Sequence, residues 1–263
     1  MRKIAYSVAV TALLCGTAQG ATVLKTSIRD LASNKESIAT VYAQDGKMRV
    51  ESGGPEDNFA VFSGDAMHAI NPKERNYVVI DRASMKQMAA TMNPMLKQLQ
   101  ERLAGMSPEQ RAQMEKMMGG QIPGMSGKPV VEEIRKTGKS GKVAGYNCSY
   151  SEVLLDGVVS SEVCVAPLGA LKGSQELYDA SAKLGALMED VLKEIDAPWL
   201  KEMATRQIEN YSKLGGVPVF ARSFSDGKPV RESTLQSIVT QSVPASTFEV
   251  PAGFTRKEIM PQR

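Results

Sequence analysis

The sequence contains few of the residues on which most catalytic and metal sites depend. In 263 residues there are one histidine, one tryptophan and three cysteines, and only 5% of the residues are aromatic. A catalytic role for His68 would require an oriented partner and a nucleophile. No G-x-S-x-G motif supplies a serine nucleophile. We therefore expect a protein that is not an enzyme and that has no resident metal or cofactor.

Long apolar runs and a strong charge of one sign are also missing. No stretch reaches the roughly 20 uncharged apolar residues that a transmembrane helix needs, so no transmembrane span is predicted. The formal net charge is +3, and no basic stripe concentrates the lysines and arginines. This distribution argues against nucleic acid as a partner.

The first twenty residues have the three-part pattern of a cleaved secretory signal. Arg2 and Lys3 precede an apolar run of about eleven residues, and small residues follow at positions 18 and 20. We expect cleavage between Gly20 and Ala21, so that residues 1–20 are a signal peptide and the mature chain folds in the periplasm. Removing both N-terminal cations lowers the net charge from +3 to +1.

The three cysteines divide between this leader and the rest of the chain. Cys15 would be removed with the signal peptide. A lipid anchor on Cys15 is the alternative, although the bulky Leu14 stands where lipoprotein signals have a small residue. Cys148 and Cys164 remain, and such a pair in an exported chain usually forms a disulfide. In a hairpin with a three-residue loop centred on Asp156 they face each other, which predicts a cross-strand bridge.

Alternating apolar and polar residues predict strands over 21–81, 130–166 and 217–254, separated by turn sequences such as Asp45-Gly46. Between them, helical periodicity covers 84–120 and 174–214. The pattern predicts an α+β fold. We expect a curved antiparallel sheet, an open half-barrel of about nine or ten strands, with two helical blocks packed on one face and a single domain over 21–263.

Two sequence features shape the first helical block, a predicted helical hairpin. Pro94 lies inside its first helix and should kink or split it. Ser107, Pro108 and Gln110 have the pattern of a capping box that starts the second helix.

Several segments resemble an exported bacterial family of unknown function. They are Thr137-Gly138, Lys142-Val143-Ala144-Gly145-Tyr146-Asn147-Cys148, Tyr150, Glu162-Val163-Cys164-Val165-Ala166, the closing Phe248-Glu249-Val250-Pro251-Ala252-Gly253-Phe254 and the stretch from Ser107 to Met118. That family is placed in the lipoprotein-carrier (LolA/LolB-like) superfamily. The resemblance implies an open half-barrel wrapped around helices, with an apolar inner face. These motifs are structural, so they imply a function only by analogy.

Methionine is the residue in clear excess, and nine of the 15 methionines lie between Met85 and Met125. They admit three interpretations. Flexible thioethers can fill the contact between helices and a curved sheet, or they can line a cleft for a lipid or a partner protein. Met-x-x-Met pairs can also bind Cu(I), for which thioethers are suitable ligands. The candidate contact residues are Met85, Met88, Met92, Met95, Met114, Met117 and Met118.

The sequence thus predicts a non-enzymatic periplasmic protein. Its expected partner is an apolar small molecule, a lipid or acyl chain, or an envelope protein, held between the sheet and the helices. The alternative is a Met-rich protein that handles copper(I).

Overall fold

The computed structural model describes residues 20–53, 57–107, 109–110, 131–195 and 214–259. The expected signal peptide, most of the second helix of the Met-rich hairpin and residues 196–213 lie outside this described part. The described elements, in chain order, are β1 (Ala21–Asp30), β2 (Glu36–Gln44), β3 (Lys47–Ser52), β4 (Phe59–Ser63), β5 (Ala66–Asn71), β6 (Asn76–Ile80), α1 (Arg82–Ala104), β7 (Glu132–Val143), β8 (Tyr146–Leu155), β9 (Val158–Pro167), η1 (Leu168–Ala170), α3 (Ser174–Lys193), β10 (Gly216–Ser225), β11 (Lys228–Gln241), η2 (Ala245–Phe248) and β12 (Thr255–Lys257).

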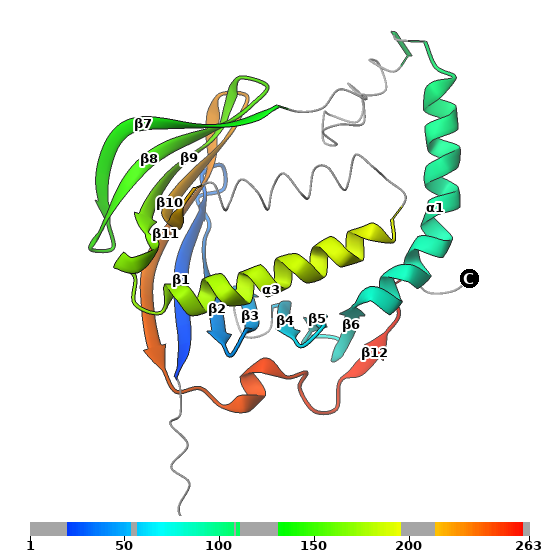
Figure 1. Cartoon of the computed structure of the whole chain (residues 1–263), viewed down its shortest axis with the longest axis horizontal. Helices are drawn as coiled ribbons and strands as arrows, with labels where there is room; N and C mark the ends of the chain where they lie inside the picture. Colours follow the sequence, from blue (N-terminus) through cyan, green and yellow to red (C-terminus); the bar gives the residue numbers. More distant parts are fainter. Residues whose placement is uncertain (1–19, 54–56, 108, 111–130, 196–213, 260–263) are drawn as a thin grey trace, which may run out of the picture.

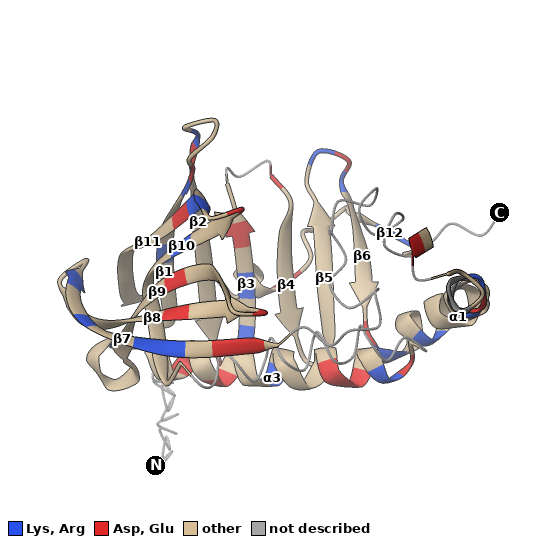
Figure 2. Cartoon of the chain, turned by 90° about the horizontal axis from the view of Figure 1, so that it is seen from above, with Lys and Arg blue, Asp and Glu red and all other residues tan. Residues whose placement is uncertain are grey.

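All twelve of these strands belong to one sheet, in the order β12-β6-β5-β4-β3-β2-β1-β11-β10-β9-β8-β7. Every pairing is antiparallel except the parallel pairing of β12 with β6. Strands β12 and β7 are the two ends of the order, and the sheet curves without closing (Figures 1 and 2). The predicted α+β open half-barrel is therefore confirmed, with somewhat more strands than expected.

Four hairpins turn through two residues of which the second is glycine. They are Asp45-Gly46, Ala144-Gly145, Asp156-Gly157 and Asp226-Gly227, and both residues of each pair have positive φ. Two-residue turns of this kind match the twist of the flanking strands, and glycine adopts positive φ without steric cost. Short turns keep neighbouring strands in sequence order across most of the sheet.

Helix α3 lies across one face of the sheet, here called the inner face (Figure 1). Its residues Leu177, Leu184 and Leu187 pack with Ala180 against a buried cluster contributed by β2, β3 and β4. That cluster consists of Ala43, Met48 and Phe62. The apolar stripe of α3 is therefore the main described cover of the inner face.

Helix α1 follows β6 directly and begins with a reciprocal cap. The Ser84 N–H donates to Asp81 Oδ1 at 2.7 Å, and the Asp81 N–H donates to Ser84 Oγ at 3.0 Å. The hydrogen bond from the Ser84 N–H is the main cause that holds the pKa of the Asp81 carboxyl below its usual value. The helix continues through Pro94 and changes direction along its length in Figure 1, so it is bent rather than split.

The predicted capping box after α1 is present. The Gln110 N–H donates to Ser107 Oγ at 3.3 Å, and Gln110 Oε1 accepts from the Ser107 N–H at 3.0 Å. The residues predicted to continue this second helix lie outside the described part of the chain. None of the described helices is both long and apolar enough to cross a bilayer.

The C-terminal segment covers the opposite, outer face over β4 and β5. Phe248 packs in a buried cluster with Phe59, Val61 and Ile70, and Arg49 donates to the Thr247 carbonyl oxygen at 3.2 Å. The predicted strand over Phe248–Phe254 is therefore wrong, because this segment serves as an apolar cover with a 3₁₀ turn. The last strand is the short β12.

Candidate functional site

The inner face is built from rows of side chains that run across neighbouring strands. Because side chains alternate between faces, residues that pair directly across strands share a face. The row beneath α3 joins Ala43, Met48, Phe62, Met67 and Ile80. The first three are buried against α3, whereas Met67 is only half-buried.

The next row along the inner face is apolar on six consecutive strands. We call it the apolar row; its members, from β1 to β6, are Leu24, Val41, Val50, Ala60, Ala69 and Val78. None of the six is fully buried, and Ala69 is exposed. Six strands at a spacing of about 4.8 Å span about 24 Å. The apolar row is therefore an elongated hydrophobic strip next to α3.

Charge is almost absent from the inner face. Over β1 to β6, the inner-face positions of the described strands carry one charged residue, Asp30, at the end of β1. Hydrogen bonds from Ser33, helped by the facing Arg231, hold the pKa of Asp30 below its usual value. Beyond β1 the face continues through Ser233, Ala221, Val163 and Ser151, a row without charge.

Charged side chains gather instead on the outer face, over β2, β1 and the strands from β11 to β7. A row of directly paired charged residues crosses seven neighbouring strands, in the order β2, β1, β11, β10, β9, β8 and β7. We call it the charged row; its members, in that order, are Glu36, Arg29, Glu232, Arg222, Glu162, Glu152 and Arg135. Arg222 lies 2.8 Å from Glu232 and 3.7 Å from Glu162, and Arg135 lies 2.6 Å from Glu152. Ions are costly to move away from water, so an uncharged inner face suits apolar contacts.

The structure separates the methionines that the sequence grouped. Met85 is buried and Met88 half-buried in a cluster with Val191 and Ile195, where α1 meets the end of α3. Met92 is half-buried, and Met95 is 67% exposed. The three remaining candidates, Met114, Met117 and Met118, lie outside the described residues.

For Met85 and Met88 the geometry is that of core packing between two helices. The junction is also held by polar contacts, since Arg82 pairs with Glu194 at 3.1 Å and Asn93 donates to the Glu194 carbonyl oxygen at 3.3 Å. Among the described residues, no group of three or more His, Cys, Asp or Glu side chains could hold a metal ion. Copper binding by the Met-x-x-Met pairs stays a prediction.

The predicted disulfide between Cys148 and Cys164 is present, with 5.4 Å between the Cα atoms. Its predicted register is wrong. The hairpin turns at Asp156-Gly157 and contains a bulge next to Val153, so Cys164 faces Tyr150 and bridges diagonally to Cys148. Both cysteines are buried in the cluster that also contains Leu171 and Val219. The disulfide therefore serves as a structural link between β8 and β9.

His68 lies on the outer face of β5, with Val61 on β4 and Val79 on β6 as its direct neighbours. Its ring is tilted at 48° to that of Tyr77, with centroids 6.0 Å apart. Its Nδ1 is buried and has no hydrogen-bond partner among the described residues. His68 thus sits on the face opposite the apolar row, and among the described residues its Nδ1 has no oriented polar partner of the kind that acid–base catalysis needs.

Comparisons with known proteins show similarity in structure but not in sequence. The sequence matches no protein-family model and no curated protein. An uncharacterized conserved protein from Thermus thermophilus has a TM-score of 0.42 at 10% identity, over 89% of each chain. MucB in the MucA/MucB complex of Pseudomonas aeruginosa is similar with a TM-score of 0.37 at 10% identity. That match covers 90% of this chain but 56% of the other, so the chain spans about half the length of that structure. No family and no activity follow from likenesses at this level.

Proposed function

We propose that the protein binds an apolar ligand, such as a lipid acyl chain, or an apolar segment of an envelope partner, between its sheet and its helices, without catalysis. The observation that carries this proposal is the apolar row, which crosses six strands of an uncharged face and is not fully buried. Ala60 and Ala69 stand next to each other in it, and both have small side chains.

The expected affinity follows from the size of this strip. Burying a methylene group contributes about 0.8 kcal/mol, so about ten buried methylenes contribute about 8 kcal/mol, which corresponds to a micromolar Kd. The strip has about the length of an extended long acyl chain. Its neutral, apolar lining offers no ion pair to a carboxylate, so chain length should determine affinity more than the headgroup does.

Export supports the same proposal. A cleaved leader would place the mature chain in the periplasm, where a disulfide such as Cys148–Cys164 is stable and where acyl chains need shielding from water. We infer that the protein acts in the cell envelope.

The test uses delipidated mature protein and a fluorescent fatty-acyl probe. Ala69→Glu introduces a charge at the exposed member of the apolar row and should weaken probe binding at least tenfold, because the ligand would have to desolvate the carboxylate. Ala182→Glu makes the same change at an exposed position of α3 and should bind like the unchanged protein. The proposal is wrong if no fatty-acyl probe binds, or if both variants bind equally well.

A further inference from the structure

The hairpin of β7 and β8 contains a cationic segment without acidic residues. From Ile134 to Ser151 there are four basic residues and no acidic one. Arg135 is paired with Glu152. Lys136, Lys139 and Lys142 are all exposed, and none of them forms an ion pair with a described residue. We call these three residues the lysine edge, because β7 is the last strand of the sheet.

The lysine edge borders the inner face. Lys136 pairs with Ser151 and Lys142 with Asn147, and these partners lie four residues apart on β8, so both lysines point to the same side. On that side the row continues from Ser151 to Val163 and Ala221, none of which is charged. Figure 2 shows the basic residues gathered along β7 and at its hairpin end. Their positive charge is therefore not neutralised by neighbouring strands.

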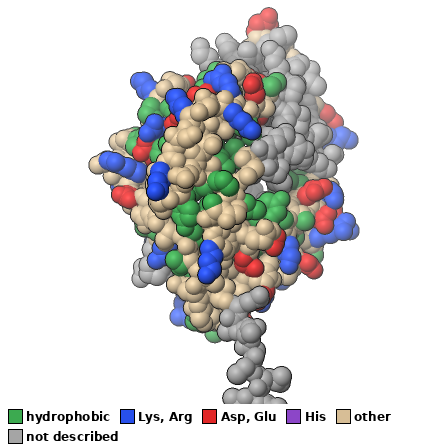
Figure 3. All heavy atoms as spheres, turned by 60° about the vertical axis from the view of Figure 1, so that its left-hand side comes forward, with side chains coloured by type: hydrophobic (Ala, Val, Ile, Leu, Met, Phe, Trp, Pro, Cys, Tyr) green, Lys and Arg blue, Asp and Glu red, His purple; other side chains and the backbone are tan. Residues whose placement is uncertain are grey.

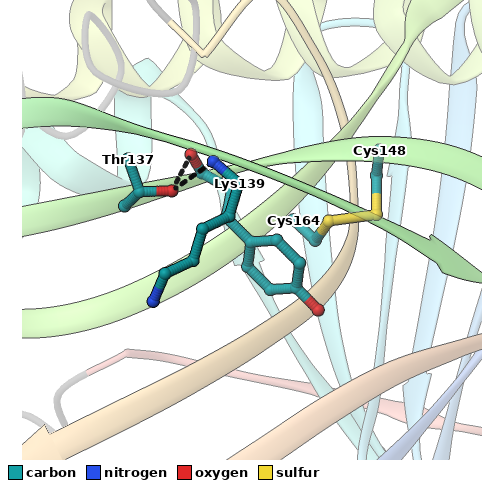
Figure 4. The surroundings of a disulfide bond; sticks show 5 residues. Thr137, Lys139, Cys148 and Cys164 are labelled. Atoms are coloured by element: carbon teal, nitrogen blue, oxygen red, sulfur yellow. Dashed lines mark hydrogen bonds between the residues drawn. A yellow bond between two sulfur atoms is a disulfide. The ribbon is translucent and has the colours of Figure 1, made fainter.

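Lys139 is held in place by a bulge in β7. The bulge lies between Lys136 and Ser140. Thr137 Oγ1 donates to the Tyr150 carbonyl oxygen at 2.9 Å and accepts from the Lys139 N–H at 3.2 Å. In Figure 4 the Lys139 side chain extends away from the nearby disulfide. Bulges often serve to redirect a side chain at a functional position.

The rest of the hairpin forms a rigid base for these lysines. The disulfide ties β8 to β9. The ring of Tyr150 lies so close to Gly141 that a Cβ atom there would be 2.8 Å from Tyr150 Cε2. Figure 3 shows a patch of hydrophobic side chains whose margin carries Lys and Arg side chains together with some Asp and Glu side chains. Positive charge beside apolar surface is typical of contact with an anionic membrane.

We propose that the lysine edge docks the protein on the surface of an anionic phospholipid bilayer. The headgroups supply negative charge along a plane, and three exposed lysines on the last strand of an open sheet can approach a plane together. Near such a surface each lysine contributes about fivefold in affinity, so three contribute about a hundredfold. This docking does not depend on a ligand at the apolar row.

The competing explanation is protection of a sheet edge, since lysines on an end strand also prevent pairing with other chains. A charge of either sign protects an edge, whereas docking requires positive charge. The first part of β7, with Glu132, Glu133 and Arg135, has mixed signs. Reversing the charges of the lysine edge therefore keeps the protection and removes the docking.

The experiment is sedimentation of the mature protein with vesicles of one-third phosphatidylglycerol and two-thirds phosphatidylcholine. Binding is expected to these vesicles and not to pure phosphatidylcholine, and it should fall between about 0.05 M and about 0.5 M salt. The triple variant Lys136→Glu, Lys139→Glu, Lys142→Glu should bind at least a hundredfold more weakly. It should keep the oligomeric state of the unchanged protein and should bind the fatty-acyl probe equally well, which separates this test from that of the apolar row.

The matched control is the triple variant Lys35→Glu, Lys86→Glu, Lys97→Glu, which makes the same charge change at exposed positions away from β7. It should bind the anionic vesicles within about threefold of the unchanged protein, because charges more than a Debye length from the contact are screened. Equal loss in both variants would show that only net charge matters and would overturn the proposal. The proposal would also be overturned if the protein binds no anionic vesicles, or if binding persists after the charges of the lysine edge are reversed.

Discussion

The two halves of the sheet are stabilised in different ways. The half from β1 to β6 is packed on both faces, with α3 on the inner cluster around Ala43 and the C-terminal segment on the outer cluster around Phe248. The half from β7 to β10 has one buried cluster, which includes a disulfide. The charged row lies on the same face as the disulfide, because Glu162 and Glu152 stand two residues from Cys164 and Tyr150 on their strands. Where one half relies on an apolar cover on each face, the other combines a single buried cluster with a covalent link and ion pairs.

The largest expected effect comes from a charge beneath α3. Ala43 is 0% exposed, so Ala43→Asp would bury a carboxylate without a partner and crowd Ala180. We expect a loss of more than about 3 kcal/mol in the free energy of unfolding, measured by urea denaturation. Val239→Asp places the same charge on the outer face of β11, at a residue that is 46% exposed, and should cost less than about 1 kcal/mol. Similar losses in both variants would contradict the distinction between the faces.

The sequence predicted the strands well, but it did not predict which strand residues share the inner or the outer face. Alternation within Ser37 to Ala43 identifies a strand, but it cannot show that Val41 stands next to Val50 and Leu24. The apolar row and the charged row depend on register across several strands. Register is set by turns and bulges whose positions a single sequence leaves open.

The methionine stripe shows that a helical pattern also leaves the tertiary neighbours of its residues open. The stripe from Met85 to Met95 predicted α1 correctly, but the pattern cannot tell a ligand cleft from a contact with another helix. Met85 became core because α3 ends beside it, with Val191 and Ile195 in reach, and that proximity is a property of the tertiary fold. The disulfide was predictable from the pairing of two cysteines, whereas the bulge near Val153 that shifts their register was not.

The next largest effect concerns the disulfide, which belongs to the less covered half. Replacing Cys148 and Cys164 with alanine removes a link between residues 16 apart and should lower the free energy of unfolding by about 3 kcal/mol. Hydrogen exchange should accelerate most in β7, β8 and β9, while amides of β2 and β3 keep more of their protection. Reductant added to the unchanged protein should reproduce both results. Uniform acceleration over the whole sheet would show instead that the two halves unfold as one unit.

The smallest expected effect tests how much the ion pairs of the charged row contribute to stability beside the disulfide cluster. Arg222 contacts both Glu162 and Glu232, and its side chain is 37% exposed. Arg222→Met keeps the apolar stem and removes both ion pairs, which should cost at most about 1 kcal/mol, less at high salt because partly exposed pairs are screened. Arg135→Met removes a single partner, Glu152, at the end of the row and should cost less still. The Arg222 guanidinium lies 5.4 Å from the centre of the Phe220 ring. If Arg222→Met lowers the free energy of unfolding equally at low and high salt, the ion pairs do not stabilise this half. The contribution of Arg222 is then apolar packing over Phe220.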